Sequence, residues 1–119
     1  MARLKIRHID DVAAITPHGY LMGGDETEEL VRVIDEQLAA GNRKLLIDLI
    51  DTVHLNSNAL GVLTKAHARY QELGGQVRLC HLTDRIENAL VITRLSLVLD
   101  VHETEREALE SFRAPAATA

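Results

Sequence analysis

The chain has 119 residues and a formal net charge of −5, with 46% hydrophobic and 26% charged residues. This length suits one soluble globular domain with a proper core. No basic stripe suggests nucleic-acid binding, and no apolar run is long enough for a signal peptide or a membrane span. The single cysteine, Cys80, excludes an internal disulfide and suits a reducing compartment. We therefore expect a cytoplasmic protein.

The chain begins with two predicted strands and a helix. LKIRHI (4–9) alternates apolar and polar residues, which predicts a half-buried strand, and VAAIT (12–16) predicts a second one. The turn between them is short, so the two strands should be antiparallel. Asp25 and Glu28 resemble a capping box that opens a helix, and Gly41 is a natural stop. Four apolar residues share one face of this helix at helical spacing: Leu30, Val31, Ile34 and Leu38.

The middle of the chain predicts strand, helix and strand. KLLIDLI (44–50) is nearly continuous and apolar, which is typical of a central strand buried on both faces. A helix follows from HLNSNALGVL (54–63) and ends at Gly74-Gly75. Its expected apolar side consists of Leu60, Leu63, His67, Tyr70 and Leu73. QVRLCHL (76–82) is the next predicted strand.

The last third predicts helix, strand and helix. Thr83-Asp84 should cap a third helix, whose inward residues are expected to be Ile86, Ala89, Leu90 and Thr93. VLDV (98–101) predicts a strand, and Thr104 with Glu107 forms a capping box for a helix through Phe112. The domain should span residues 1–113, and we expect the small-residue tail, 114–119, to be disordered. The order ββαβαβαβα indicates an α/β domain with a mixed, mostly parallel sheet.

Motifs for catalysis or metal binding are missing from the sequence. Six histidines are present, but no two stand at the spacing of a helix or loop ligand pair. Cys80 lies in an apolar strand pattern, which favours a buried, inert thiol. The chain has no phosphate-loop pattern, and its paired carboxylates fall on outer helix faces. We therefore expect no cofactor, no metal and no enzymatic activity.

One strand-to-helix corner stands out. Asn56, Ser57 and Asn58 are all good helix caps, so one of them could simply cap the helix. The corner is also expected at the carboxyl end of a central strand, where α/β domains place functional groups. A hydroxyl at a helix start could be phosphorylated without melting the helix, which would make this corner suitable for a switch.

Residues 45–82 resemble the STAS domain of anti-sigma-factor antagonists. In that family an apolar strand ends in Asp-Leu, Asp-Ser-Ser-Gly-Leu-Gly opens a helix, and a Gly-Gly turn leads to another strand. Here the strand ends at Asp48-Leu49, the helix opens at 56–61, and Gly74-Gly75 precedes the next strand. HETEREALESF (102–112) is similar to the family's closing helix. The resemblance implies a single STAS domain.

This sequence departs from the family at the corner. Asn56 stands for Asp, Ser57 retains the first serine, Asn58 stands for the second, and Ala59 stands for glycine, followed by Leu60 and Gly61. In the antagonists the second serine is phosphorylated by a kinase that is also the anti-sigma factor, and Asn58 cannot accept a phosphate. Ser57 is then the residual phosphoacceptor candidate, although as the first of the pair we expect it to turn inward.

A second departure is Arg94, which replaces a glycine common near the end of the family's third helix.

The resemblance implies a non-enzymatic binding module for an anti-sigma factor or a serine-kinase type ATPase domain, with contact through residues 56–61. The alternative is a STAS scaffold in a sensory complex, or a cytoplasmic accessory of a lipid or anion transporter. A nucleotide-binding or enzymatic role is a third and remote alternative, since no phosphate loop supports it. The sequence leaves open whether the chain is a monomer or a dimer.

Overall fold

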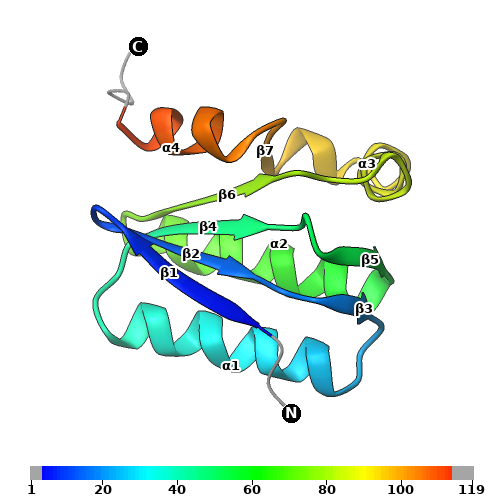
Figure 1. The fold of residues 1–119 in the computed structure, drawn as a ribbon, viewed down its shortest axis with the longest axis horizontal. Coiled ribbons are helices and arrows are strands. Elements are labelled where there is room, and N and C mark those ends of the chain that lie inside the picture. Colours follow the sequence, from blue (N-terminus) through cyan, green and yellow to red (C-terminus); the bar gives the residue numbers. More distant parts are fainter. Residues whose placement is uncertain (1–3, 114–119) are drawn as a thin grey trace.

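A five-stranded sheet forms the centre of the computed structural model, which describes residues 4–113 (Figure 1). Its strands lie in the order β1-β2-β4-β6-β7. Their bounds are Lys5–Ile9 for β1, Val12–Thr16 for β2, Lys44–Asp48 for β4, Gln76–Cys80 for β6 and Asp100–His102 for β7. β1 is antiparallel to β2, and the other neighbours are parallel. The predicted mixed, mostly parallel sheet with an antiparallel first strand is confirmed.

Two short strands were not predicted from the sequence. β3 (Gly19–Leu21) and β5 (Thr52–Leu55) pair in parallel as a separate two-stranded ribbon. Both are short and lie beside turn residues, which hides their periodicity. The predicted strand 44–50 therefore ends at Asp48, and the 56–61 corner follows β5 rather than the central strand β4. The expected placement of the corner directly after a central strand was wrong.

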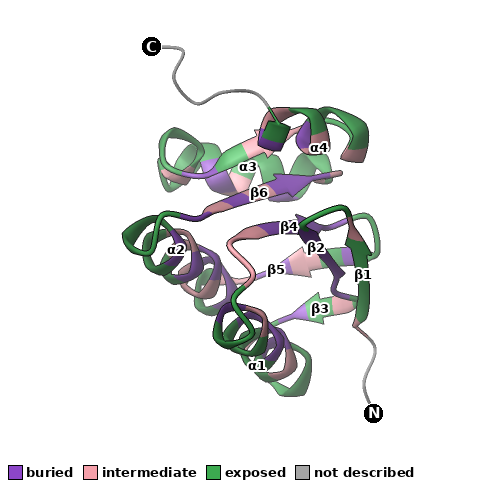
Figure 2. Cartoon of the chain, turned by 90° about the vertical axis from the view of Figure 1, so that its left-hand side faces the viewer, coloured by how far each residue is buried: buried purple, intermediate pink, exposed green. Residues whose placement is uncertain are grey.

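Within residues 4–113, four α-helices pack around the main sheet. They are α1 (Asp25–Ala39), α2 (Ser57–Glu72), α3 (Asp84–Ile92) and α4 (Glu105–Arg113). α1 and α2 cover one face, α3 extends the same core at one end, and α4 lies on the other face (Figure 1). Buried residues are concentrated on β2, β4 and the inner sides of the helices (Figure 2). β4 is the middle strand and its last four residues are buried, as the apolar run predicted.

The helix ends follow the sequence signals with one exception. Thr83 caps α3 by accepting a hydrogen bond from the N–H of Ile86, and Thr104 accepts one from the N–H of Glu107. Gly41 has φ +95°, as expected of a residue just past a helix. The predicted capping box at Asp25 was wrong, because the cap is Gly24 and Asp25 is already helical. Acidic residues in the first turn of α1 still favour the helix dipole.

Several predicted inward positions are exposed. Val31, Leu73 and Thr93 lie at the solvent side of their helices, where they flank the true buried stripe. The strand at 4–9 was expected to be half-buried, and this was wrong, because β1 is an edge strand and Ile6 is 42% exposed. The last strand was expected at 98–101 but comprises Asp100–His102, because residues 95–97 form a 3₁₀ turn (η1, Leu95–Leu97).

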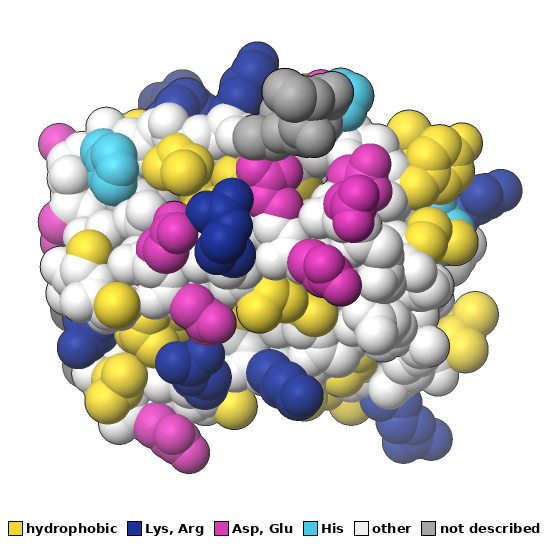
Figure 3. Space-filling view, turned by 90° about the horizontal axis from the view of Figure 1, so that it is seen from below, with side chains coloured by type: hydrophobic (Ala, Val, Ile, Leu, Met, Phe, Trp, Pro, Cys, Tyr) yellow, Lys and Arg dark blue, Asp and Glu magenta, His cyan; other side chains and the backbone are white. Residues whose placement is uncertain are grey.

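Positive and negative side chains are mixed on the surface shown in Figure 3. On the face viewed from below, basic and acidic side chains are interspersed with hydrophobic ones (Figure 3). Ion pairs such as Arg32–Glu36 on α1 and Arg69–Asp35 between α2 and α1 belong to this pattern. Such mixed charges are a solvated helix surface rather than a footprint for nucleic acid.

Candidate functional site

The 56–61 corner is the capped start of α2, and it directly follows the end of the β3–β5 ribbon. Asn56 has an extended backbone, and its side-chain oxygen accepts a hydrogen bond from the N–H of Ala59 at 3.2 Å. Its own N–H donates to the carbonyl of Leu21 at 3.1 Å, which ties the start of α2 to the end of β3. Of the three candidate caps, Asn56 is therefore the one that caps the helix.

The next two residues face solvent. Ser57 and Asn58 are exposed, whereas Ala59 and Leu60 are buried and Gly61 is half-buried. The expectation that Ser57 turns inward was wrong, because the inward side of α2 begins two residues later, at Ala59. The corner thus presents a hydroxyl and an amide to solvent and keeps its apolar residues in the core.

The loop before α1 lies against Asn58. A β-carbon added to Gly23 would lie 3.4 Å from Asn58 Cγ, so the amide packs over the Gly23 backbone. Gly23 has φ +91°, a conformation that glycine adopts without strain. Its N–H donates to Thr27 Oγ1 at 2.9 Å, and Thr27 is buried. Nothing in the sequence indicated that this loop meets the corner.

Exposed apolar side chains flank the corner. Tyr20 is 57% exposed, Met22 49% and Val53 48%, and all three lie on the β3–β5 ribbon or just after it. The first turn of α2 carries no acidic residue, so no side chain there offsets the positive end of its dipole. We call Tyr20, Met22, Gly23, Ser57 and Asn58 the corner surface. An apolar and uncharged exposed surface of this kind suits contact with another protein.

A second group of polar side chains lies under α4, at the carboxyl ends of β4 and β6. Asp48 Oδ1 is 2.9 Å from His81 Nδ1 and accepts the N–H of Ile50 at 3.0 Å. Cys80 Sγ is 3.8 Å from the same His81 nitrogen. Asp48 and Cys80 are buried, and His81 is partly exposed. We call Asp48, Cys80 and His81 the strand-end cluster.

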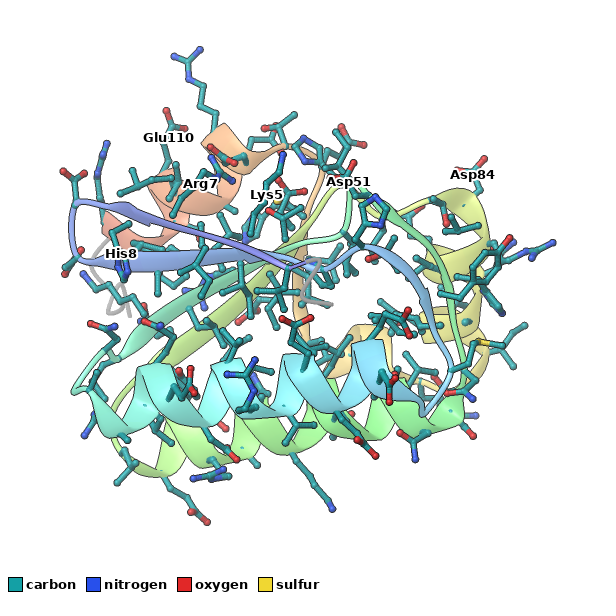
Figure 4. The ribbon with its side chains drawn as sticks, turned by 60° about the horizontal axis from the view of Figure 1, so that its bottom comes forward. Lys5, Arg7, His8, Asp51, Asp84 and Glu110 are labelled. Carbon is teal, nitrogen blue, oxygen red and sulfur yellow. The ribbon has the colours of Figure 1, made fainter. Side chains whose placement is uncertain are left out.

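An ion pair borders the strand-end cluster. Arg7 reaches from β1 toward α4, where it makes two hydrogen bonds to Glu105 at 2.6 and 3.2 Å (Figure 4). Its guanidinium is also 3.7 Å from Asp48 Oδ2. The hydrogen bond to Glu105 raises the pKa of Arg7 above its usual value. Nothing in the sequence indicated that Arg7 pairs with a residue of α4, so its role across the sheet was missed.

The chemistry of Cys80 follows from its surroundings. It is the last residue of β6 rather than a mid-strand residue, and it is buried. Burial raises the pKa of the thiol to about 12, and the nearby Asp48 charge acts in the same direction. Both Cys80 and Asp48 approach the same nitrogen of His81, so the three do not form a relay of nucleophile, base and orienting acid.

Sequence comparison assigns the family. The STAS domain family matches residues 3–108. The chain belongs to the STAS domain family. A protein of Thermotoga neapolitana named as a candidate anti-sigma factor antagonist is 32% identical to this STAS chain over 107 residues, which are 88% of this chain and 93% of that protein.

Solved structures agree with this assignment. A candidate anti-sigma factor antagonist of Thermotoga maritima superposes with a TM-score of 0.87 at 26% identity, covering 93% of this chain and 95% of that one. The Bacillus protein SpoIIAA in its phosphorylated form gives a TM-score of 0.72 at 14% identity, covering 92% and 98%, and so shows the same fold. The predicted STAS fold is confirmed. Over residues 4–113, none of the helices has the length and apolar character needed to cross a bilayer.

Proposed function

We propose that this STAS protein is an anti-sigma-factor antagonist-like binding module that acts without catalysis. Its partner is an anti-sigma factor or a serine-kinase type ATPase domain in the cytoplasm. The contact uses the corner surface together with residues 56–61. The observation that carries the proposal is the exposed Ser57–Asn58 pair, fixed at a capped helix start and flanked by exposed Tyr20 and Met22.

Rigidity supports this role for the corner surface. The Asn56 cap, the hydrogen bond from Asn56 to Leu21 and the packing of Asn58 over Gly23 hold the segments 21–23 and 56–59 together. A surface that is ordered before binding loses less entropy when a partner docks. Tyr20 and Met22 supply the exposed aromatic and flexible apolar side chains that are common in protein interfaces.

Regulation by phosphate should differ from that of the phosphorylated antagonists. Asn58 has no hydroxyl, so position 58 cannot be phosphorylated. Ser57 is exposed and is the one hydroxyl left between residues 56 and 61. Successive helical residues point in directions about 100° apart, so a kinase that reaches position 58 does not present its phosphate to Ser57 in the same way. We expect the partner contact to be constitutive.

Capture from native lysate on the immobilised protein identifies the partner, and calorimetry with the purified partner measures its affinity. A kinase-type ATPase domain that binds wild type and loses affinity for a Met22→Ala variant supports the proposal. A Val31→Ala variant on α1 is the matched control, because Val31 is also exposed and lies outside the corner surface. Capture of a transporter or sensory-complex subunit instead would favour the scaffold or accessory alternative.

Intact mass after incubation with the captured kinase and ATP tests the phosphate prediction. Wild type should gain no phosphate, and Asn58→Ser should gain one. A stoichiometric phosphate on Ser57 of the wild type would show that the acceptor has moved by one residue.

A further inference from the structure

The strand-end cluster has the composition of a metal site. Asp48, Cys80 and His81 each offer one ligand atom, and these atoms lie within 4.8 Å of one another. A thiolate, an imidazole and a carboxylate are the three ligand types that Zn²⁺ prefers in proteins. In a tetrahedral zinc site, ligand atoms are roughly 3.3–3.7 Å apart, given bonds of about 2.0–2.3 Å. The separation of 3.8 Å between Cys80 Sγ and His81 Nδ1 is close to this range. The separation of 2.9 Å between Asp48 Oδ1 and His81 Nδ1 is a hydrogen-bond distance, and it would have to widen by about 0.4 Å around the ion.

The backbone brings these ligands together in an unusual way. Neighbouring residues in a strand point to opposite faces, so Cys80 and His81 would normally diverge. His81 instead has φ +59°, a left-handed conformation that is uncommon for a residue other than glycine. This turn of the chain places its ring beside Cys80 and Asp48. Backbone conformations of this kind cost energy and concentrate at functional sites.

Charge balance also favours a cation. Arg7 and Glu105 neutralise each other in their two hydrogen bonds, so this paired arginine lies at the longer distance of 3.7 Å from the buried Asp48. The closer polar contacts of Asp48 are His81 Nδ1 and the N–H of Ile50. A dication bound by the Asp48 carboxylate and a Cys80 thiolate would be balanced by their two negative charges. Burying balanced charge is less costly than burying an unpaired one.

We propose that Asp48, Cys80 and His81 form a zinc site in which the protein supplies three of the four ligands. Zinc would be bound by Cys80 Sγ, His81 Nδ1 and a carboxylate oxygen of Asp48, with water in the fourth position. The Cys80 proton leaves to solvent on binding, as coordinated thiols are deprotonated. The ion can enter past His81, whose side chain is 28% exposed, while that of Asp48 is 6% exposed.

Such a site would join the carboxyl ends of β4 and β6 under α4, independently of the corner surface. It departs from the sequence-based expectation of no metal, because the three ligands share no spacing motif. They come from the ends of two strands that are adjacent in the sheet but far apart in the chain.

The test is calorimetric titration of tag-free, chelator-treated protein with Zn²⁺ alone, together with the absorption spectrum of the Co²⁺-loaded protein. We expect one zinc per chain and a thiolate-to-cobalt charge-transfer band. Cys80→Ser and His81→Asn should each weaken zinc binding at least tenfold, because changing a residue that merely supports a metal ligand already costs about 10- to 100-fold, and Cys80→Ser should abolish the band. Asparagine tolerates the left-handed conformation, so His81→Asn should fold.

His8→Asn is the matched control, because His8 is an exposed histidine on the other side of β1 from Arg7 (Figure 4). It should bind zinc as wild type does, and circular dichroism should show native folds for all variants. Three results would overturn the proposal. They are the absence of stoichiometric zinc binding, unchanged affinity in both ligand variants, and one zinc shared between two chains.

Discussion

The side chain of Asn58 lies over the backbone of Gly23, where an added β-carbon would be 3.4 Å from Asn58 Cγ. This contact joins the loop before α1 to the start of α2, although the two are far apart in the chain. The contact makes the corner surface one unit, so a substitution in either segment should alter the conformation of the other.

Gly23→Ala should destabilise the protein and disturb the corner. At φ +91° an alanine is strained by roughly 1–2 kcal/mol, and relief of this strain would shift the backbone on which Asn58 packs. Gly61→Ala is the matched control, because Gly61 lies inside α2 with open space where a methyl group would go. That change should stabilise by about 0.5–1 kcal/mol. Urea unfolding of both variants checks the prediction, and equal effects in the two would contradict it.

Loss of the Asn56 cap should cost more than loss of either neighbour. Asn56→Ala leaves the N–H of Ala59 without its acceptor, at a cost of about 0.5–2 kcal/mol. Ser57→Ala and Asn58→Ala should change the free energy of unfolding by less than about 0.5 kcal/mol, as is usual for exposed positions. Thermal melts of the three variants rank them. If the melting temperature of Asn56→Ala equals that of wild type, Asn56 is not the cap.

Replacing Arg94 with glycine should stabilise the fold. Arg94 is exposed and has φ +65°, where an L-residue with a side chain is strained. Relief of this strain exceeds the extra chain entropy of glycine, for a net gain of about 0.5–1 kcal/mol. Glycine is also the residue that the resemblance to the STAS family led us to expect at this position. A lower midpoint in chemical unfolding of Arg94→Gly would show that the Arg94 side chain makes a compensating contact.

Strong alkali should unfold the protein through two buried acids. Burial raises the pKa of Tyr70 from 10.0 to about 12 and that of Cys80 from 9.0 to about 12. The unfolded chain therefore loses these protons at lower pH than the folded chain. The stability from the neutral groups is complete below pH 9 and falls progressively as the pH rises toward 12.

Urea unfolding at pH 8 and at pH 10.5, with chelator present, measures this loss of stability. The double variant Tyr70→Phe, Cys80→Ala removes both acids and should lose less stability between the two pH values than wild type, whatever its stability at pH 8. Parallel losses in the two proteins would mean that other groups control the alkaline transition.

The sequence was informative where patterns are long and local. The apolar run at 44–50 and the helical spacing of residues 30–38 determine the sheet centre and α1, and the Asp-Leu and Asn-Ser-Asn signals led to the STAS fold and the corner. The ribbon strands were missed because a strand of three or four residues has too few positions to show a period.

Contacts between segments that are far apart in the chain could not be predicted from the sequence either. Asn58 meets Gly23, and Arg7 meets Glu105, although each pair is far apart in the chain. Asp48 meets His81 because β4 and β6 are adjacent in the sheet. The exposure of Ser57 depends on where the inward side of α2 begins. The inward side begins where it does because Asn56, and not Ser57 or Asn58, caps α2. All three residues are good caps, so local propensity does not decide between them.

The central claim is that Asn58 lies in the partner interface, and titration calorimetry of Asn58→Asp against the captured ATPase domain tests it most directly. The new carboxylate is favoured by the helix dipole by about 0.3–1 kcal/mol, so the fold should persist. A charge buried against the partner without a counter-ion is costly to desolvate, so affinity should fall at least about tenfold. Gln71→Glu, at the exposed far end of α2, should bind as wild type does. If Asn58→Asp also bound with wild-type affinity, position 58 would lie outside the interface and the corner would be only a well-capped helix start.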